Sequence, residues 1–130
     1  MVRHHAEPEA AIASAHMLLE MVCKHILDGM NIPYSDTADI PTLLKATTEQ
    51  LSLAPSQYLE EAFRRIFGDT AHVVEGLGSL GNAGKGLVKL SSRHAELAVN
   101  MAGAAAMFLV ETWRAQLEEL LEDLEDSKGG

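Results

Sequence analysis

The sequence has little cysteine, no excess of basic residues and no long uninterrupted apolar run. Cys23 is the single cysteine among 130 residues, so a disulfide scaffold is excluded. No uninterrupted run approaches the ~20 apolar residues that cross a bilayer. The first ten residues also lack the apolar stretch of a signal peptide. These absences predict a soluble protein of the reducing cytoplasm with no membrane partner.

The charge balance limits the partners further. Lysine and arginine number 10 against 19 aspartates and glutamates, which gives a formal net charge of −9. Residues 116–130 hold six of the acids and one lysine, so the C-terminal end is the most acidic part. The chain offers no wide basic platform, and we therefore expect it to bind neither duplex DNA nor an anionic membrane surface.

Apolar residues make up 47% of the sequence, which is enough for a chain of this length to bury one core. They recur at spacings of three and four along residues 12–30, 43–51, 59–80 and 97–124, and no segment alternates with period two. We predict an all-α bundle of about four helices with a long C-terminal helix. In this interpretation residues 1–6 are a flexible leader, 7–126 a single helical-bundle domain and 127–130 a flexible tail.

Local signals predict the helix boundaries and faces. Pro8 marks the start of the first helix, Asp39 caps the second and Ser92 lies at the start of the fourth. Residues 76–86, where five of eleven are glycine, predict a frayed helix end followed by a loop. The spacing assigns the following residues to the inner faces of the third and fourth helices: Leu59, Ala62, Phe63, Ile66, Phe67, Val73, Val74, Leu77 and Leu80, then Leu97, Met101, Ala104, Ala105, Phe108, Leu109 and Thr112.

Two patterns resemble ligand sites without meeting their requirements. Gly76, Gly78 and Gly81 fit the spacing of a dinucleotide-binding loop, but that loop follows a strand and these glycines follow a helix. Ligand or nucleotide sensing at this glycine-rich segment stays open as a third interpretation. His16 and Cys23 share a helix face, yet a metal site needs three or four ligands. We predict a buried, inert thiol at Cys23, and neither a metal nor a cofactor.

One pair of residue types could act on a phosphodiester. Arg64 and Arg65 precede His72 by about two helical turns. An arginine there could neutralise the phosphate while the histidine transfers a proton. The alternative is that all three are solvent-facing polar side chains.

Residues 76–112 contain the strings GLGSL, SSRHAELAVN and FLVET, which together resemble the C-terminal domain of abortive infection proteins, the Abi_C type. Residues 8–27 resemble the first helix of that family, and the likeness continues more loosely through residues 32–45. The resemblance implies membership of the HEPN superfamily of helical-bundle ribonucleases in antiphage and toxin systems. Such proteins dimerise and cut RNA without metal, using an arginine, a polar residue and a nearby histidine.

The sequence departs from that family motif. Asn82 matches its polar residue, but Gly81 stands in place of the arginine, and no histidine occurs between His72 and His94. We therefore predict a non-catalytic interaction or dimerisation domain of an abortive-infection or toxin–antitoxin system, with a toxin or antitoxin protein as a partner. A natural degenerate member and an engineered, inactivated form both fit this departure.

The alternative function is a metal-independent ribonuclease with a displaced site. Its catalytic residues would be Arg64, Arg65 and His72, and Lys85 would contact the RNA phosphate.

The long C-terminal helix also suggests how a homodimer would form. A helix from Ser92 to about Asp126 is longer than a domain of this size is wide, so its leucine-bearing end needs a cover. We predict a symmetric dimer whose surface comprises Ala102, Ala106, Leu117, Leu120, Leu121 and Leu124. The alternative is a tail that folds back on its own first helix.

Overall fold

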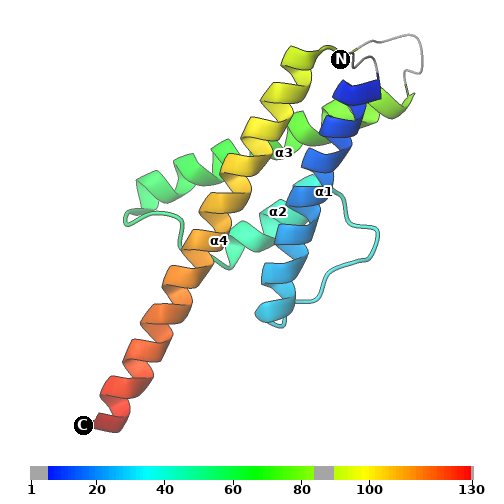
Figure 1. The fold of residues 1–130 in the computed structure, drawn as a ribbon. Helices are drawn as coiled ribbons and strands as arrows, with labels where there is room; N and C mark the ends of the chain where they lie inside the picture. The colour runs from blue at the N-terminus through cyan, green and yellow to red at the C-terminus, as the bar shows by residue number, and fades with distance from the viewer. Residues whose placement is uncertain (1–5, 84–89, 130) are drawn as a thin grey trace.

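The structure is a computed structural model that describes residues 6–83 and 90–129. It contains four helices: α1 (Ala6–Gly29), α2 (Ile40–Glu49), α3 (Gln57–Ala83) and α4 (Ser92–Gly129). Over these two ranges the backbone forms no strand. The predicted all-α fold with a long C-terminal helix is therefore confirmed (Figure 1).

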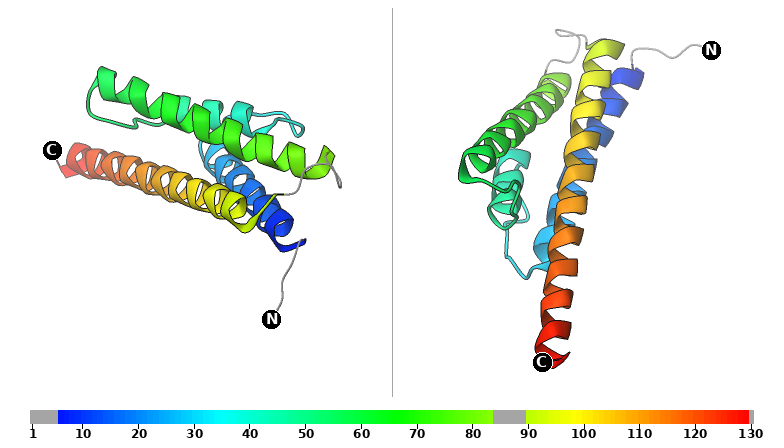
Figure 2. Two further views of the ribbon diagram at one scale, coloured as in Figure 1. Left: turned by 90° about the horizontal axis from the view of Figure 1, so that it is seen from above. Right: turned by 90° about the vertical axis from the view of Figure 1, so that its left-hand side faces the viewer.

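The helices form two layers. The most extensive helix–helix packing joins α1 to α4, and these two lie side by side on one side of the molecule. The shorter α2 pairs with α3 in the second layer, behind them in the orientation of Figure 1 (Figure 2). The C-terminal end of α4 extends beyond every other helix (Figure 1). The core lies where the two layers meet.

The predicted start signals act at the helix ends. The Asp39 side chain accepts a hydrogen bond from the backbone N–H of Thr42 at 2.9 Å, and Pro41 lies in the first turn of α2. Such a cap satisfies one of the amide groups that a helix leaves unpaired at its start. At the start of α4, the carbonyl of Ser91 accepts from the backbone N–H groups of His94 and Ala95 at 3.1 and 3.2 Å.

The apolar stripe of α1 forms the centre of the core. Leu19, Cys23, Ile26 and Leu27, which lie within the predicted stripe of residues 12–30, are fully buried. Burial raises the pKa of the Cys23 thiol to about 11, although a hydrogen bond with Thr47 opposes the shift. A thiol that stays protonated and inaccessible is a poor nucleophile. The buried position predicted for Cys23 is confirmed.

The inner face of α4 differs from the prediction. Leu97 and Ala104 were predicted to face inward, but Leu97 is 51% exposed and Ala104 is also exposed, whereas the predicted Ala105 and Leu109 are buried. The face that packs inward is a row of small residues ending in one leucine: Ala95, Ala98, Ala102, Ala105, Ala106 and Leu109. Small side chains allow two helices to approach closely, so the packing of α1 displaced the larger residues outward. The same correction applies to Leu59 and Ile66 of α3, which are exposed.

One contact locks the end of α1 against α4. A Cβ atom placed on Gly29 would lie 2.5 Å from Cζ2 of Trp113, so only glycine fits beneath this indole. The Trp113 ring also meets the His25 ring edge-on, with ring centroids 5.5 Å apart. Trp113 is therefore the last large side chain of α4 that packs on α1.

The predicted loop at residues 76–86 is wrong in its first part. Helix α3 continues through Ala83, so residues 76–83 are helical, and the remaining residues 84–86 lie outside the described ranges. Intrahelical hydrogen bonding overrode the low helix propensity of glycine, about 1 kcal/mol per residue. Residues 127–129, predicted as flexible tail, belong to α4. The leader residues 1–5 are not described, and Ala6 already belongs to α1.

Two helices are long and apolar enough to cross a membrane when judged by length and composition alone. They are Pro8–Gly29 and Ser92–Lys128, with mean hydropathy of 1.3 and 1.2. Polar residues interrupt the apolar residues of both helices, so only an average over a window reveals them. Both helices also supply core residues, with 33% of each window buried. Core helices of ordinary bundles meet the same criterion, so this finding assigns no membrane role.

We expect Gly29→Ala to destabilise the protein, because its methyl group would overlap the Trp113 ring. Overpacking of this kind typically costs about 1–3 kcal/mol of unfolding free energy. Urea denaturation followed by circular dichroism measures the loss. Gly76→Ala is the matched control, because a Cβ there meets no atom within 4 Å. An unchanged denaturation midpoint for Gly29→Ala would show that the contact does not fix the packing.

Candidate functional site

A groove runs along the surface between α2 and α3. These helices are joined by a short loop and pack against each other as an antiparallel pair, so the start of α2 lies near the middle of α3. The groove has a volume of about 420 Å³. Its apolar lining comes from Pro41, Leu44 and Phe67, and its polar lining is mostly basic.

The groove brings together the residues predicted for the displaced site. Arg64, Arg65 and His72, all from α3, line it. Lys45 of α2 joins them, although no sequence pattern had indicated it. The only sequence feature that points to Lys45 is its position next to Leu44, a buried residue of the helix that pairs with α3. The other predicted phosphate contact, Lys85, lies outside the described residues.

The basic side chains differ in their partners. The Arg64 guanidinium donates to Glu60 Oε1 at 3.3 Å, one turn earlier on α3. In the described part of the chain, no carboxylate forms an ion pair with Lys45 or Arg65. Three cations against one acid, Glu49, line the groove. The groove is therefore a locally positive site on an acidic protein.

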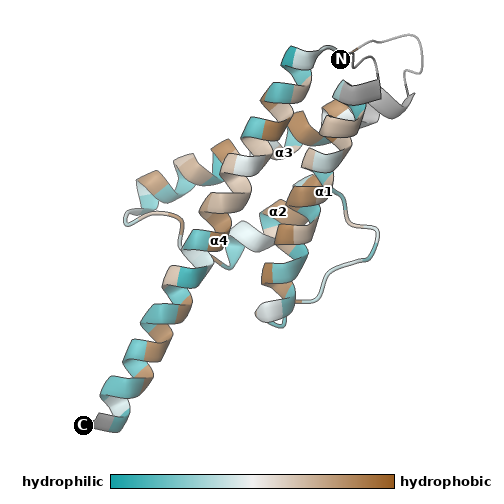
Figure 3. Cartoon of the chain, in the orientation of Figure 1, coloured by the Kyte–Doolittle hydropathy of each residue, from teal (hydrophilic) through white to brown (hydrophobic). Residues whose placement is uncertain are grey.

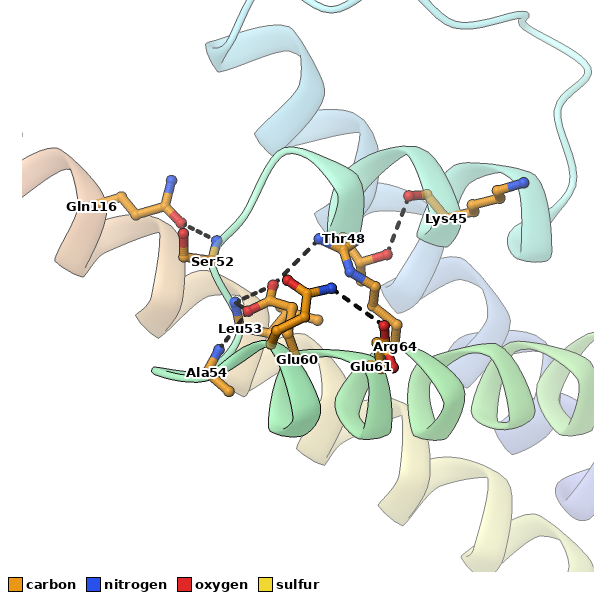
Figure 4. A network of polar contacts seen from close by, with 10 residues as sticks. Lys45, Thr48, Ser52, Leu53, Ala54, Glu60, Glu61, Arg64 and Gln116 are labelled. Atoms are coloured by element: carbon orange, nitrogen blue, oxygen red, sulfur yellow. Dashed lines mark hydrogen bonds and ion pairs between the residues drawn. The ribbon is translucent and has the colours of Figure 1, made fainter.

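Glu60 fixes the end of the groove where α2 passes into α3. Its carboxylate accepts from the backbone N–H of Leu53 at 2.9 and 3.1 Å and from that of Ala54 at 3.0 Å (Figure 4). The Leu53 bond is the main cause that holds the pKa of Glu60 below its ordinary value. The Ala54 bond and the Arg64 charge add to this lowering, and burial opposes it. The same carboxylate thus shapes the loop and holds Arg64 in place.

Glu75 fixes the opposite end. Its Oε1 accepts from the backbone N–H of Ile40, the first residue of α2, at 3.1 Å. The same oxygen lies 3.2 Å from Nε2 of His16 on α1. One carboxylate therefore ties three helices together. His16, considered with Cys23 as a metal ligand, is instead held by Glu75.

The glycine motif is placed where it cannot cradle a phosphate. Gly76, Gly78 and Gly81 lie in the interior of α3, and a helix rather than a strand precedes them. Amides inside a helix bond to carbonyls four residues earlier, so they are not available to a pyrophosphate. This removes the basis for nucleotide sensing at these glycines. Asn82 lies in the last turn of the same helix.

The predicted dimer residues fall into two groups. Ala102 and Ala106 are 0% and 5% exposed within the single chain, so they offer almost no free surface to a second copy. The four leucines of the C-terminal end are 42–60% exposed: Leu117, Leu120, Leu121 and Leu124. The backbone N–H of Ser52 donates to Oε1 of Gln116 at 2.6 Å. Residues 117–128 are all exposed, so α4 leaves the bundle directly after this bond.

Comparison with known proteins gives one match. The family model Abi_C, described as a HEPN-like domain, matches residues 2–113. This confirms the family resemblance identified in the sequence. No curated protein and no solved structure gives a significant match. The matched region contains the entire α2–α3 groove and ends at Trp113, four residues before the exposed stretch of α4 that begins at Leu117.

We expect Glu60 to make stability depend on pH. Its pKa is lowered in the folded state, so its contribution is present above the pKa of an unfolded glutamate, about 4.3. It is lost as the pH falls through the lower folded value. Chemical denaturation of the wild type between about pH 3 and 6 should thus show a loss of stability that Glu60→Gln shows only in part.

The alanine variant tests the hydrogen bonds of Glu60 rather than its charge. Glu60→Ala leaves the Leu53 and Ala54 amides without their acceptor, which typically costs about 1–3 kcal/mol at neutral pH. Glu61→Ala is the matched control, because that exposed neighbour bonds only to the Gln57 side chain. Equal denaturation midpoints for the two alanine variants would contradict the role given to Glu60.

Proposed function

Because the chain belongs to the Abi_C family of HEPN-like domains, we propose that it serves an abortive-infection system through protein assembly rather than RNA cleavage. The positions that match the ribonuclease motif hold Gly81 and Asn82, which supply neither a cation nor a proton-transfer group. The observation that carries the proposal is the uncovered leucine stripe of α4. Its cover would be a second copy of the chain, in the cytoplasm.

The leucine stripe continues the face of α4 that packs on α1. Trp113, Leu117, Leu120 and Leu124 follow one another at spacings of four, three and four, the repeat by which a helix presents one seam to a partner helix. Trp113 is covered by the end of α1, and α1 stops there at Gly29. The stripe beyond it has the same character but no cover within the described chain (Figure 3).

The acidic residues of this region do not prevent self-association. Successive residues of a helix point about 100° apart. On that geometry the four leucines fall within one sector of α4, and the six acids fall on the remaining sides. Two copies could thus pair through their leucines while both sets of carboxylates stay in water. A homodimer buries the stripe without bringing like charges face to face.

Further apolar area would come from exposed side chains elsewhere on α1 and α4. A standard interface takes about 800 Å² from each partner, which is more than four half-exposed leucines provide. Met17 and Met21 of α1 and Met107 of α4 are 58%, 62% and 68% exposed. Methionine is common at surfaces that adapt to partners. Besides a second copy of the chain, a toxin or antitoxin protein could bind the leucine stripe and these methionines.

A second candidate function is the displaced ribonuclease, and the α2–α3 groove favours it. Arg64, Arg65 and His72 share this groove, so a phosphodiester bound there could meet both a cation and a proton-transfer group. Against it, Arg64 is already paired with Glu60. No described residue beside the groove supplies a second histidine for the opposite proton transfer.

We expect the full chain to sediment as a dimer and Leu117→Ser/Leu124→Ser to weaken that dimer at least about 100-fold, because each copy loses two buried leucines. Sedimentation equilibrium over a range of concentrations measures the dissociation constant. Glu118→Ser/Glu125→Ser is the matched control on the acidic side of the same helix. A wild-type monomer at all concentrations, or equal dissociation constants for the two variants, would rule out the leucine stripe as the interface.

For RNA, we expect no cleavage above the buffer control. Loss of acid–base groups alone typically removes about 10²–10⁴-fold of rate. The assay follows a labelled single-stranded RNA with chelator present, comparing wild type with His72→Ala. Cleavage by the wild type that disappears in His72→Ala would establish the second candidate instead of the first.

A further inference from the structure

We propose that the exposed end of α4 pairs in the antiparallel direction with the same segment of a second copy, so that Leu120 of each copy lies against Leu124 of the other. This inference rests on the assembly function proposed above. It adds the direction and the register of the contact and the surface beside it. The tail of the second copy would lie in line with α1, at the point where α1 ends.

The position of α1 determines which side of α4 the second copy can use. Helices α1 and α4 start at the same end of the bundle and run in the same direction, and α4 continues beyond the end of α1 (Figure 1). The side of α4 that meets α1 at Gly29 and Trp113 is the side that carries the leucines further along. A partner helix on the leucines therefore continues the row that α1 begins.

A parallel pair would be blocked by the two bundles. Helices that pack together lie about 8–10 Å apart, and a helix with its side chains is about 10–12 Å wide. In a parallel pair both α1 helices would lie between the two α4 helices directly before the leucine stripes, which could then not meet. In an antiparallel pair the bundles lie at opposite ends, and each α1 meets only the tip of the other tail.

The length of the exposed segment sets the register. Residues 117–128 are all exposed, and they form about 18 Å of helix at 1.5 Å per residue. Two such segments overlap fully only when the twofold axis passes near residue 122, in the middle of the segment. Leu120 then faces Leu124 of the second copy. The last turn of each tail ends within about one turn of Trp113 of the other copy.

Leu121 also fits the antiparallel direction. It lies beside the seam formed by Leu117, Leu120 and Leu124, and it is 60% exposed. A twofold axis across the helices brings each edge of the seam against the same edge of the other copy, so the two Leu121 side chains would meet near the axis. A twofold axis along the helices would place them on opposite sides of the seam.

The charge at the tip of the tail matches its place in this arrangement. Lys128 is the only cation after Arg114, and it lies in the last turn of α4. The register would bring it next to the end of α1 in the second copy. The last turn of α1 has no basic residue and contains the exposed Asp28. A cation is favourable at such a helix end, where the carbonyl groups carry partial negative charge.

Disulfide formation by single-cysteine variants of the full chain tests the direction. We expect a mixture of Leu120→Cys and Leu124→Cys to form a crosslinked dimer at least about tenfold faster than either variant alone, because only the mixed pair has facing sulfur atoms. Glu122→Cys is the control, because 100° per residue places it on the far side of the helix. The wild type serves as a second control, because its Cys23 is buried.

Small-angle X-ray scattering of the wild-type dimer gives a second measurement that needs no variant. With the axis at residue 122, Ser92 lies 30 residues from it in each copy, so the two starts of α4 would be about 90 Å apart. We therefore expect a maximum dimension of at least about 90 Å. A dimer no longer than one α4 helix, about 57 Å for 38 residues, would contradict the antiparallel arrangement.

The outcomes separate the direction of pairing from pairing itself. If either single variant crosslinks as fast as the mixture, or the mixture no faster than Glu122→Cys, the antiparallel arrangement is wrong while the dimer stands. If the wild type sediments as a monomer at all concentrations, the assembly function and this inference fall together.

Discussion

The close packing of α1 on α4 is the constraint on which the rest of the structure depends. The row of alanines on α4 removes the side-chain bulk between the two helices, and Gly29 lets the Trp113 ring lie against the end of α1. The alanines contribute little apolar area themselves, so α4 gains mainly from close contact, whereas α1 supplies large buried side chains such as Leu19, Ile26 and Leu27. The larger methionine and leucine side chains of α1 and α4 that do not fit into this interface lie exposed on the outside of the bundle. An apolar outer face and a tightly packed inner face are therefore two results of one arrangement.

The second layer is positioned by carboxylates rather than by apolar packing alone. Glu75 joins α1, α2 and α3 through His16 and the Ile40 amide, and Glu60 holds the α2–α3 loop through two further amides. A carboxylate that accepts backbone N–H groups fixes direction as well as distance, which apolar contacts do not. This explains why α2 and α3 can leave an open groove between them without collapsing onto it. The two aromatic rings Phe63 and Phe108 stack 5.4 Å apart and join the same layer to α4.

The fold class, the helix starts and the core face of α1 could be predicted because they depend on local signals: spacing, a capping aspartate and proline positions. The inner face of α4 could not, since Leu97 and Ala98 are both apolar and only the approach of α1 decides which of them is buried. The predicted end of α3 lies several residues before the observed one. Helix propensities penalise the glycines of this segment, but they do not include the hydrogen bonds by which an existing helix continues. The Arg64, Arg65 and His72 cluster followed from helical spacing. Lys45 did not, because its place opposite them results from the antiparallel pairing of two helices.

Residues that add nothing to the stability of the single chain point to where it acts. Leu117, Leu120, Leu121 and Leu124 expose apolar surface to water. A chain under selection for stability alone would be expected to lose this stripe, since polar residues at its positions would be at least as stable. The family match ends at Trp113, so the groove lies inside the matched domain and the leucine stripe lies beyond it. Under the assembly proposed above, the matched domain supplies the bundle, and the part of α4 beyond it carries the apolar stripe that would meet a partner.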